Sequence, residues 1–191
     1  MKSKLFLTGE SGCGKSTLLL QELGKSLAEA GGFLTVRKKT EDGRILGFDL
    51  IMPDGTKEQR FLDFTKKPPI RMEVFQGLGV WCLEHTTEYS FVVLDEIGGI
   101  ELLDEDFSRA IYDFLNRDVP CIGVVKGNGP ASGMIQALGL SERYEQERKR
   151  LWHTLESMEQ VQVVEMSGWD DVHAKQAVQQ WIQKYGRRDM C

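Results

Sequence analysis

The chain has 191 residues, and its 24 lysines and arginines against 29 aspartates and glutamates give a formal net charge of −5. This length predicts a single domain over residues 1–191, large enough to bury a core without disulfides or a structural metal. The acidic balance argues against a general binder of nucleic acid or of anionic membranes, because a net negative surface attracts neither. It does not exclude a local positive site for a small anion.

Cysteines and histidines give no sign of a metal centre. Cys13, Cys82, Cys121 and Cys191 are scattered without a CxxC pair, and the histidines share no metal-ligand spacing. The N-terminus does not have the pattern of a signal peptide, and no apolar stretch approaches the roughly 20 residues that span a bilayer. Reduced thiols without a signal or a span predict a cytoplasmic protein.

The first half of the chain predicts one strand, one helix and an antiparallel segment. An apolar run at residues 4–8 is typical of a buried strand. After a glycine-rich break, apolar residues at helical spacing predict a helix from about residue 18 to 30, ended by Gly31 and Gly32. Turn signals then separate three predicted strands, at residues 33–37, 45–52 and 60–64. Such short links favour antiparallel pairing, because a parallel return needs a crossover of a dozen or more residues.

The second half alternates helices with buried strands. Helices are predicted at residues 74–85, 107–115 (with Asp104 as N-cap), 140–158 and 174–185. Strands are predicted at residues 91–94, 119–125 and 161–164. This alternation predicts an α/β layer fold whose mainly parallel sheet is extended by an antiparallel segment over about residues 33–64.

The break after the first strand matches the phosphate-loop pattern GxxxxGK[ST], through Gly9, Glu10, Ser11, Gly12, Cys13, Gly14, Lys15 and Ser16. Glycines in such a loop aim backbone N–H groups at phosphate oxygens, and the helix that follows turns its positive end toward the same anion. Lys15 is placed to reach the β- and γ-phosphates, Ser16 to bind Mg²⁺, and Thr17 to help with the α-phosphate. The pattern follows a predicted strand and opens a predicted helix, so it predicts a nucleotide-phosphate site.

A second acidic element completes the predicted site. The strand at residues 91–94 ends in Asp95 and Glu96. Asp95 is expected to join Ser16 in holding Mg²⁺, and Glu96 to orient or deprotonate an attacking water. Lys15 and Glu96 are therefore the predicted catalytic residues.

The cation that stabilises the transition state is left open. Arg37, Arg44 and Arg109 fall near the predicted site, whereas Arg143, Arg148 and Arg150 lie in a mixed-charge helix typical of a solvated face. The guanine-reading pattern NKxD is absent, so the base preference is also open. Among the tryptophans, Trp81 and Trp181 fit core-facing helix sides. Trp152 and Trp169 are candidates for exposure, and either could stack on a base.

Four segments together carry a family resemblance: GESGCGKST (9–17), GGFLT (31–35), GRILGF (43–48) and DEIGGIELLDEDF (95–107). With these segments the chain resembles the small P-loop nucleoside-triphosphatase family first known from thermophiles, whose animal relatives are called cancer-related nucleoside-triphosphatase. The resemblance implies a three-layer P-loop sandwich. It also implies Mg²⁺-dependent hydrolysis of ATP, GTP and other nucleoside triphosphates to diphosphates, with relaxed base choice.

The chain lacks two positively charged residues of the family pattern. After DEIG the family usually has a lysine, and here the residue is Gly99. The late Asn-Arg-Asp of the family has no match near residues 168–170. Two alternatives that share the phosphate loop therefore stay open. One is a small-molecule or nucleotide kinase, with residues 142–150 as a lid and 126–133 as a substrate loop. The other is a slow nucleotide-dependent switch that binds a protein partner.

Overall fold

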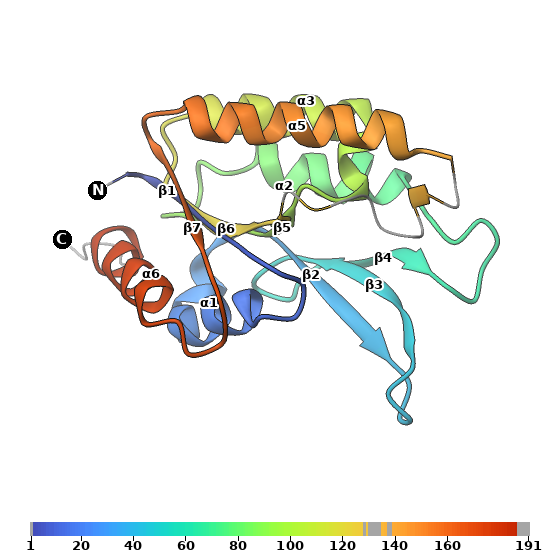
Figure 1. Cartoon of the computed structure of the whole chain (residues 1–191), viewed down its shortest axis with the longest axis horizontal. Coiled ribbons are helices and arrows are strands. Elements are labelled where there is room, and N and C mark those ends of the chain that lie inside the picture. The colour runs from blue at the N-terminus through green and yellow to red at the C-terminus, as the bar shows by residue number, and fades with distance from the viewer. Residues whose placement is uncertain (1, 128, 130–134, 137–138, 187–191) are drawn as a thin grey trace.

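The computed structural model describes residues 2–127, 129, 135–136 and 139–186. Within these residues a seven-stranded sheet runs through the molecule in the order β4-β3-β2-β5-β6-β1-β7 (Figure 1). The strands are β1 (Lys4–Thr8), β2 (Gly31–Lys39), β3 (Ile45–Ile51), β4 (Glu58–Asp63), β5 (Val92–Ile97), β6 (Cys121–Val125) and β7 (Val161–Glu165). The five strands from β2 to β7 are parallel, and β3 and β4 extend them antiparallel. The predicted α/β fold with a mixed sheet is confirmed.

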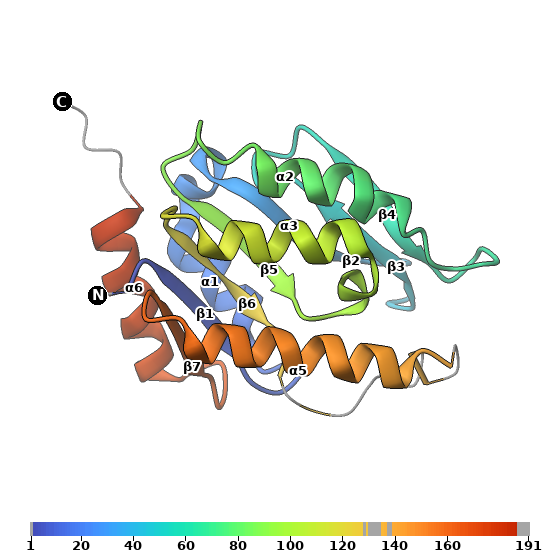
Figure 2. The same cartoon turned by 90° about the horizontal axis from the view of Figure 1, so that it is seen from above.

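Helices cover both faces of the sheet and make three layers. Helices α1 (Lys15–Leu23) and α6 (Val172–Tyr185) cover one face, and α2 (Val80–Glu84), α3 (Glu105–Asn116) and α5 (Ser141–Ser157) cover the other. Seen from above, α2, α3 and α5 lie side by side (Figure 2). A π-helical turn, Phe75–Gly79, leads into α2, and a short 3-10 turn, Ile100–Leu103, leads into α3. In the described part of the chain, no helix combines the length and the apolar character that crossing a bilayer requires.

Each face of the sheet has its own hydrophobic cluster. On the α2–α3–α5 face, the ring of Phe107 packs against Phe33 and Phe75, with ring centroids 5.8 and 5.7 Å apart. On the α1–α6 face, Phe91 meets Trp181 edge-to-face at 5.8 Å. The central strands are buried on both sides, which explains their continuous apolar sequence.

Side chains predicted to be in the core are mostly found there. Cys82, Cys121 and Trp181 are buried, whereas Cys191 lies outside the described residues. Trp81 packs against the same core as predicted, although its side chain is only partly buried. It stacks on His85 and lies under the ammonium of Lys57.

The first predicted helix is too long, and glycine geometry explains the difference. Helix α1 ends at Leu23, because Gly24 takes a φ of +50°, and a 3-10 turn, Gly24–Glu29, follows. Gly32 does not end a helix but pairs within β2, where a Cβ would lie 2.1 Å from the carbonyl oxygen of Val93. The close approach of two strands requires glycine there, and sequence periodicity does not show that contact.

Two aspartates fix the beginnings of α3 and α6. The predicted N-cap Asp104 is confirmed, since its carboxylate accepts a hydrogen bond of 2.9 Å from the N–H of Phe107. Asp171 does the same for Ala174 at the start of α6, at 3.0 Å. Each carboxylate satisfies an N–H group that the first helical turn leaves unpaired. The second cap matters for the site, because it anchors the connection between β7 and α6.

Candidate active site

The phosphate-loop residues lie at the carboxyl end of β1 and lead directly into α1. Gly9, Gly12 and Gly14 have φ values of +136°, +85° and +99°, which L side chains rarely adopt. A Cβ on Gly9 would also lie 2.3 Å from the carbonyl oxygen of Met166. Glu10, Ser11 and Thr17 are exposed, and Cys13 packs in part against the α1–α6 cluster. The loop is therefore held in one conformation beside the residues that follow β7.

Lys15 brings a positive charge to the centre of the loop. Its side chain is buried, and Nζ donates hydrogen bonds to the carbonyl oxygens of Gly9 at 2.9 Å and of Glu10 at 2.7 Å. A cation and the N-terminus of α1 thus converge on the same point. This combination attracts a phosphate group.

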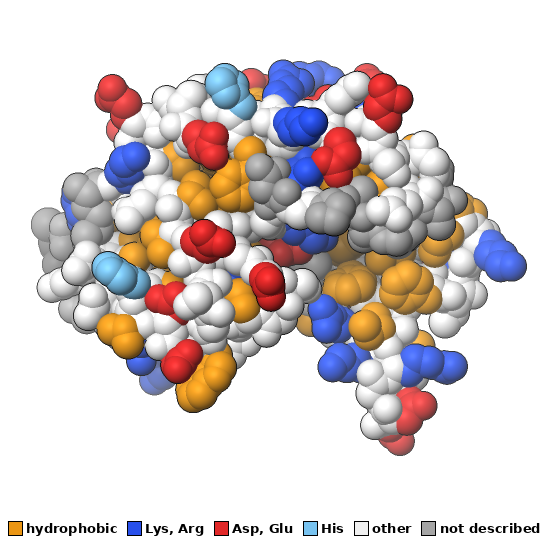
Figure 3. All heavy atoms as spheres, viewed as in Figure 1, with side chains coloured by type: hydrophobic (Ala, Val, Ile, Leu, Met, Phe, Trp, Pro, Cys, Tyr) orange, Lys and Arg blue, Asp and Glu red, His pale blue; other side chains and the backbone are white. Residues whose placement is uncertain are grey.

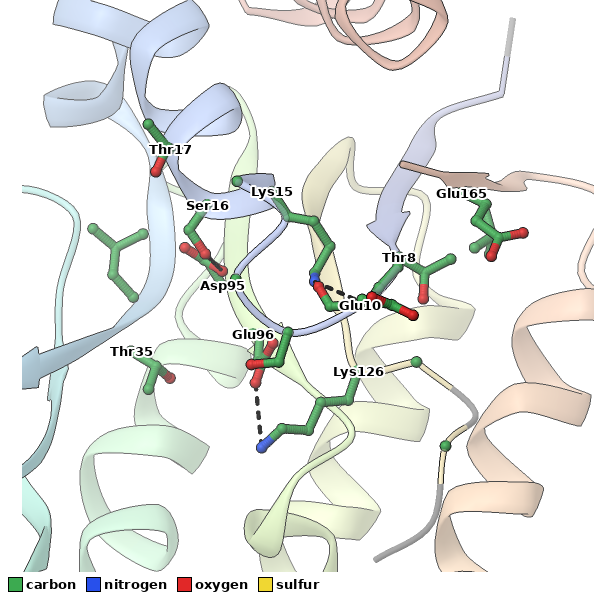
Figure 4. Close-up of a pocket in the computed structure, with 18 of the residues that line it drawn as sticks. Thr8, Glu10, Lys15, Ser16, Thr17, Thr35, Asp95, Glu96, Lys126 and Glu165 are labelled. Carbon is green, nitrogen blue, oxygen red and sulfur yellow. Dashed lines mark hydrogen bonds and ion pairs between the residues drawn. The ribbon is translucent and has the colours of Figure 1, made fainter. Parts of the chain in front are cut away.

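Ser16 and Asp95 join the loop to the end of β5. The hydroxyl of Ser16 donates a hydrogen bond of 2.8 Å to the Asp95 carboxylate (Figure 4). Asp95 is only 3 % exposed. Burial raises the pKa of this carboxyl group to about 7, against the hydrogen bond from Ser16, and the neighbouring charge of Glu96 adds to the rise.

These two oxygen groups fit a magnesium ion. Mg²⁺ is usually held by one or two carboxylates together with phosphate oxygens and water. Ser16 and Asp95 supply one hydroxyl and one carboxylate side by side. Among the described residues no group of three or more His, Cys, Asp or Glu could hold a metal. The donor set therefore fits an ion whose coordination a bound phosphate completes.

Glu96 is paired with a lysine from the neighbouring strand. The Lys126 ammonium lies 3.2 Å from the Glu96 carboxylate, and both side chains remain partly exposed (Figure 4). Lys126 follows β6 directly. Burial alone would lower the pKa of Lys126, but the carboxylates of Glu96 and Glu101 raise it above its usual value.

The neighbourhood of Gly99 explains how Lys126 fits. The buried carboxylate of Glu101 accepts a hydrogen bond of 2.7 Å from the Gly99 N–H. A Cβ on Gly99 would lie 2.7 Å from that carboxylate and 3.1 Å from the Lys126 ammonium. The glycine that breaks the family pattern therefore leaves room for a cation from another strand. The sequence pattern did not predict this contact, and Lys126 was named only as part of the substrate loop in the kinase alternative.

A pocket of about 1350 Å³ opens in front of these groups. It lies between the phosphate loop and the β2–β3 hairpin, which projects from the body of the molecule (Figure 3). Thr35, Arg37 and Phe48 line the hairpin side. The hydroxyl of Thr8 is buried in the pocket wall and makes no hydrogen bond to any residue described by the structure. The pocket is thus polar at the loop and mixed at the hairpin.

The candidate arginines do not gather in one place. Arg37 lines the pocket, with its guanidinium over the Phe48 ring, whereas Arg44 and Arg109 are exposed. Arg143 pairs with Glu105, and Arg150 lies over the Tyr112 ring. The prediction of a solvated face is wrong for Arg148, which is 4 % exposed and bonded to Glu145.

The two segments of the kinase alternative have different outcomes. Residues 142–150 belong to α5, which packs on the sheet layer through Tyr144 and Leu151. A lid would have to leave that layer. In the predicted substrate loop, 126–133, residues 128 and 130–133 lie outside the described residues.

Comparisons with known proteins find relatives of this chain. The model of a family described as NTPase matches residues 4–162. The nucleoside-triphosphatase THEP1 of Thermotoga sp. strain RQ2 is 31% identical over 132 residues, which covers 64% of this chain and 74% of the relative. The nucleoside-triphosphatase THEP1 of Thermococcus kodakarensis is 27% identical over 140 residues, or 65% of this chain and 77% of the relative.

Two solved structures share the fold. The crystal structure of THEP1 from the hyperthermophile Aquifex aeolicus matches with a TM-score of 0.60 and 21% identity, and covers 91% of this chain and 96% of that one. The solution structure of a human cancer-related nucleoside triphosphatase matches with a TM-score of 0.59 and 19% identity, covering 97% and 99%. The likeness extends over nearly the whole length of both chains.

Proposed function

The chain belongs to the NTPase family, and we propose that it hydrolyses nucleoside triphosphates to diphosphates and phosphate in a Mg²⁺-dependent reaction with relaxed base choice. The observation that carries the proposal is the hydrogen bond of 2.8 Å between Ser16 and Asp95. It joins the phosphate loop to the acidic end of β5, beside Glu96. Phosphate binding, metal binding and activation of water therefore meet within one pocket.

Binding and charge neutralisation fall to the phosphate loop. Its backbone N–H groups and Lys15 hold the β- and γ-phosphates, and Ser16 and Asp95 would hold Mg²⁺. When bound, the ion neutralises negative charge on the phosphate oxygens. Burial raises the pKa of Asp95 to about 7, so a cation bound beside it would stabilise its anionic form.

Water activation falls to Glu96. Its carboxylate takes a proton from the water whose oxygen attacks the γ-phosphorus, while the bond from that phosphorus to the diphosphate breaks. Lys126 orients the Glu96 carboxylate through their contact of 3.2 Å. Its charge also lies on the side of the pocket where negative charge grows during the reaction.

The sequence has no NKxD pattern, so it gives no sign of that guanine-reading mode. Discrimination among bases requires donors and acceptors placed against their edges, because unpaired polar groups are what reject a wrong base. The groups that carry the proposed chemistry contact only phosphate, metal and water.

Phosphate release from ATP, GTP, CTP and UTP, with and without Mg²⁺, tests the proposal. We expect wild-type protein to hydrolyse all four only with Mg²⁺, and Lys15→Ala to bind none of them. Glu96→Gln should retain nucleotide binding and lose at least about a hundredfold in kcat, the lower range for a general base.

Glu165→Gln is the matched control. It makes the same carboxylate-to-amide change at an exposed residue on the other side of the phosphate loop (Figure 4). Its rate should equal that of wild type. Wild-type rates in Glu96→Gln would contradict the role of Glu96. The absence of release from any triphosphate by the wild type would contradict the proposed function as a whole.

A further inference from the structure

The connection between β7 and α6, residues 166–171, runs along one flank of the phosphate loop. The N–H of Met166 donates a hydrogen bond of 2.8 Å to the carbonyl oxygen of Thr8. The carbonyl oxygen of Met166 lies only 2.3 Å from the position that a Cβ on Gly9 would take. Farther along, the Cβ of Trp169 lies 3.4 Å from the Cβ position of Gly14. The connection thus follows the phosphate loop from its first glycine to the start of α1.

Trp169 is 83 % exposed at this point. The other three tryptophans are accounted for by their contacts. Trp181 is buried, Trp81 stacks on His85, and the indole N–H of Trp152 donates to the Lys126 carbonyl oxygen at 3.1 Å. An indole left open to water loses the free energy that its burial would supply, so a bound aromatic group would gain from covering it.

The turn that carries Trp169 is fixed by hydrogen bonds. Both the N–H and the hydroxyl of Ser167 donate to the Asp171 carboxylate, at 3.0 and 2.9 Å. The N–H of Asp171 donates to the Gly168 carbonyl oxygen at 3.2 Å, and its carboxylate also caps α6. The indole therefore projects from a preorganised turn, which lowers the entropy cost of stacking against it.

The sheet order gives the bound nucleotide a direction. Strands β5 and β6 lie on one side of β1, and β7 lies on the other. Under the proposed function, Asp95 and Glu96 meet the γ-phosphate end of a bound triphosphate from the β5 side. The nucleoside end must then leave the loop away from Glu96. Trp169 stands on that opposite flank, beside the last glycine before Lys15.

From these observations we propose that Trp169 is the stacking surface for the nucleobase of the bound nucleotide. This inference rests on the proposed function and adds the subsite for the nucleoside. Every base has a π-face, so stacking on an indole accepts any of the four and favours the larger purines. Base-tolerant binding then follows from one aromatic side chain without contacts to base edges.

The test separates the base from the phosphates. Affinities for ATP, GTP, CTP, UTP and inorganic tripolyphosphate are measured calorimetrically with Mg²⁺, in the Glu96→Gln background so that the nucleotides stay intact. Trp169→Ala should weaken the binding of all four nucleotides by about tenfold, most for the purines, because losing one stacked aromatic has roughly this effect. Tripolyphosphate affinity should not change. Trp169→Phe should restore most of the loss.

Phe64→Ala is the matched control, since Phe64 is an exposed aromatic that follows β4 at the far edge of the sheet. It should change no affinity. Unchanged nucleotide affinities in Trp169→Ala, or an equal loss for tripolyphosphate, would overturn the proposal. Wild-type protein that binds nucleotides without hydrolysing them would contradict the proposed function alone. If wild-type protein binds tripolyphosphate as tightly as it binds any nucleotide, the stacking subsite alone would be contradicted.

Discussion

The two flanks of the phosphate loop differ in chemistry. On the β5–β6 flank, the Asp95 carboxylate accepts a hydrogen bond from Ser16, and the Glu96 carboxylate forms an ion pair with Lys126. On the β7–α6 flank, the Met166 carbonyl oxygen and the Trp169 Cβ lie beside the loop, and the Asp171 carboxylate is hydrogen-bonded within its own turn. Under the proposed function the first flank breaks the phosphoanhydride bond, and under the stacking proposal the second flank holds the nucleobase. The comparison predicts that kcat and affinity can be changed separately.

Gly9→Ala should have the largest effect, because it should disturb both flanks of the loop and so change kcat and affinity together. The new Cβ would meet the Met166 carbonyl oxygen at 2.3 Å in a backbone conformation with a φ of +136°. The loop must shift, and strain of about 1–3 kcal/mol corresponds to a loss of roughly 5- to 150-fold in nucleotide affinity. Titration with both ATP and tripolyphosphate checks this.

Gly43→Ala is the control for that prediction. Gly43 also has a positive φ, +82°, but nothing lies within 4 Å of its Cβ position at the tip of the β2–β3 hairpin. This variant should lose stability and keep its nucleotide affinity. A similar loss of affinity in both variants would mean that general destabilisation, not the loop contact, is responsible.

Lys126→Met should affect only the β5–β6 flank, and therefore kcat rather than affinity. We expect kcat to fall on the order of tenfold with little change in KM, less than for a fully enclosed donor because the side chain is half exposed. Initial rates over a range of ATP concentrations separate the two constants. Lys175→Met, which removes a surface lysine paired with Glu22, is the control and should match wild type. A change confined to KM would contradict the assigned role.

Gly99→Ala should produce a smaller effect of the same kind. The added Cβ would come within 3.1 Å of the Lys126 ammonium, which can move because it ends a flexible side chain, and within 2.7 Å of the Glu101 carboxylate. A displaced cation predicts a loss of a few-fold in kcat. In the Lys126→Met background the same substitution should have a weaker effect, because the displaced group is gone. Full additivity of the two changes would contradict the coupling.

Asp171→Asn should affect only the β7–α6 flank, and least of all. Hydrogen bonds from Ser167 and Ala174 lower the pKa of Asp171 to about 2, from 3.8. Its carboxylate therefore stabilises the folded state above about pH 4, and this contribution disappears as the pH falls toward 2. The wild type should have the higher Tm at pH 7, with a gap that narrows below pH 4. A gap independent of pH would contradict the assignment.

Local patterns predicted one half of the site, and contacts set by the sheet order make up the other half. The phosphate loop is contiguous, so its residue spacing alone predicts where Lys15 and Ser16 lie relative to α1. The contact between Lys126 and Glu96 requires β6 to lie beside β5. The sequence around either residue does not predict that pairing. The signal available in the sequence was weak: Lys126 directly follows one apolar run, and Asp95 and Glu96 directly follow another.

The other misses have the same origin. Arg148 was expected in water because its neighbours in the sequence are charged, yet helix geometry turns it inward toward the layer that α5 covers. Trp169 could be predicted as exposed, but its position beside Gly14 depends on β7 pairing with β1. Periodicity predicts which elements form and leaves open which elements become neighbours.

The two separate hydrophobic clusters have a mechanical consequence. Lys15 and Ser16 stand on α1, which is seated through Leu18 and Leu19 in one cluster, while the turn that holds Glu101 is seated through Ile100 and Leu102 in the other. The sheet therefore separates two supports. The phosphate-loop residues are anchored on one side of it, and the turn beside Lys126, which pairs with Glu96, is anchored on the other. A cavity made in one cluster would therefore displace the residues anchored there and leave those anchored in the other cluster in place.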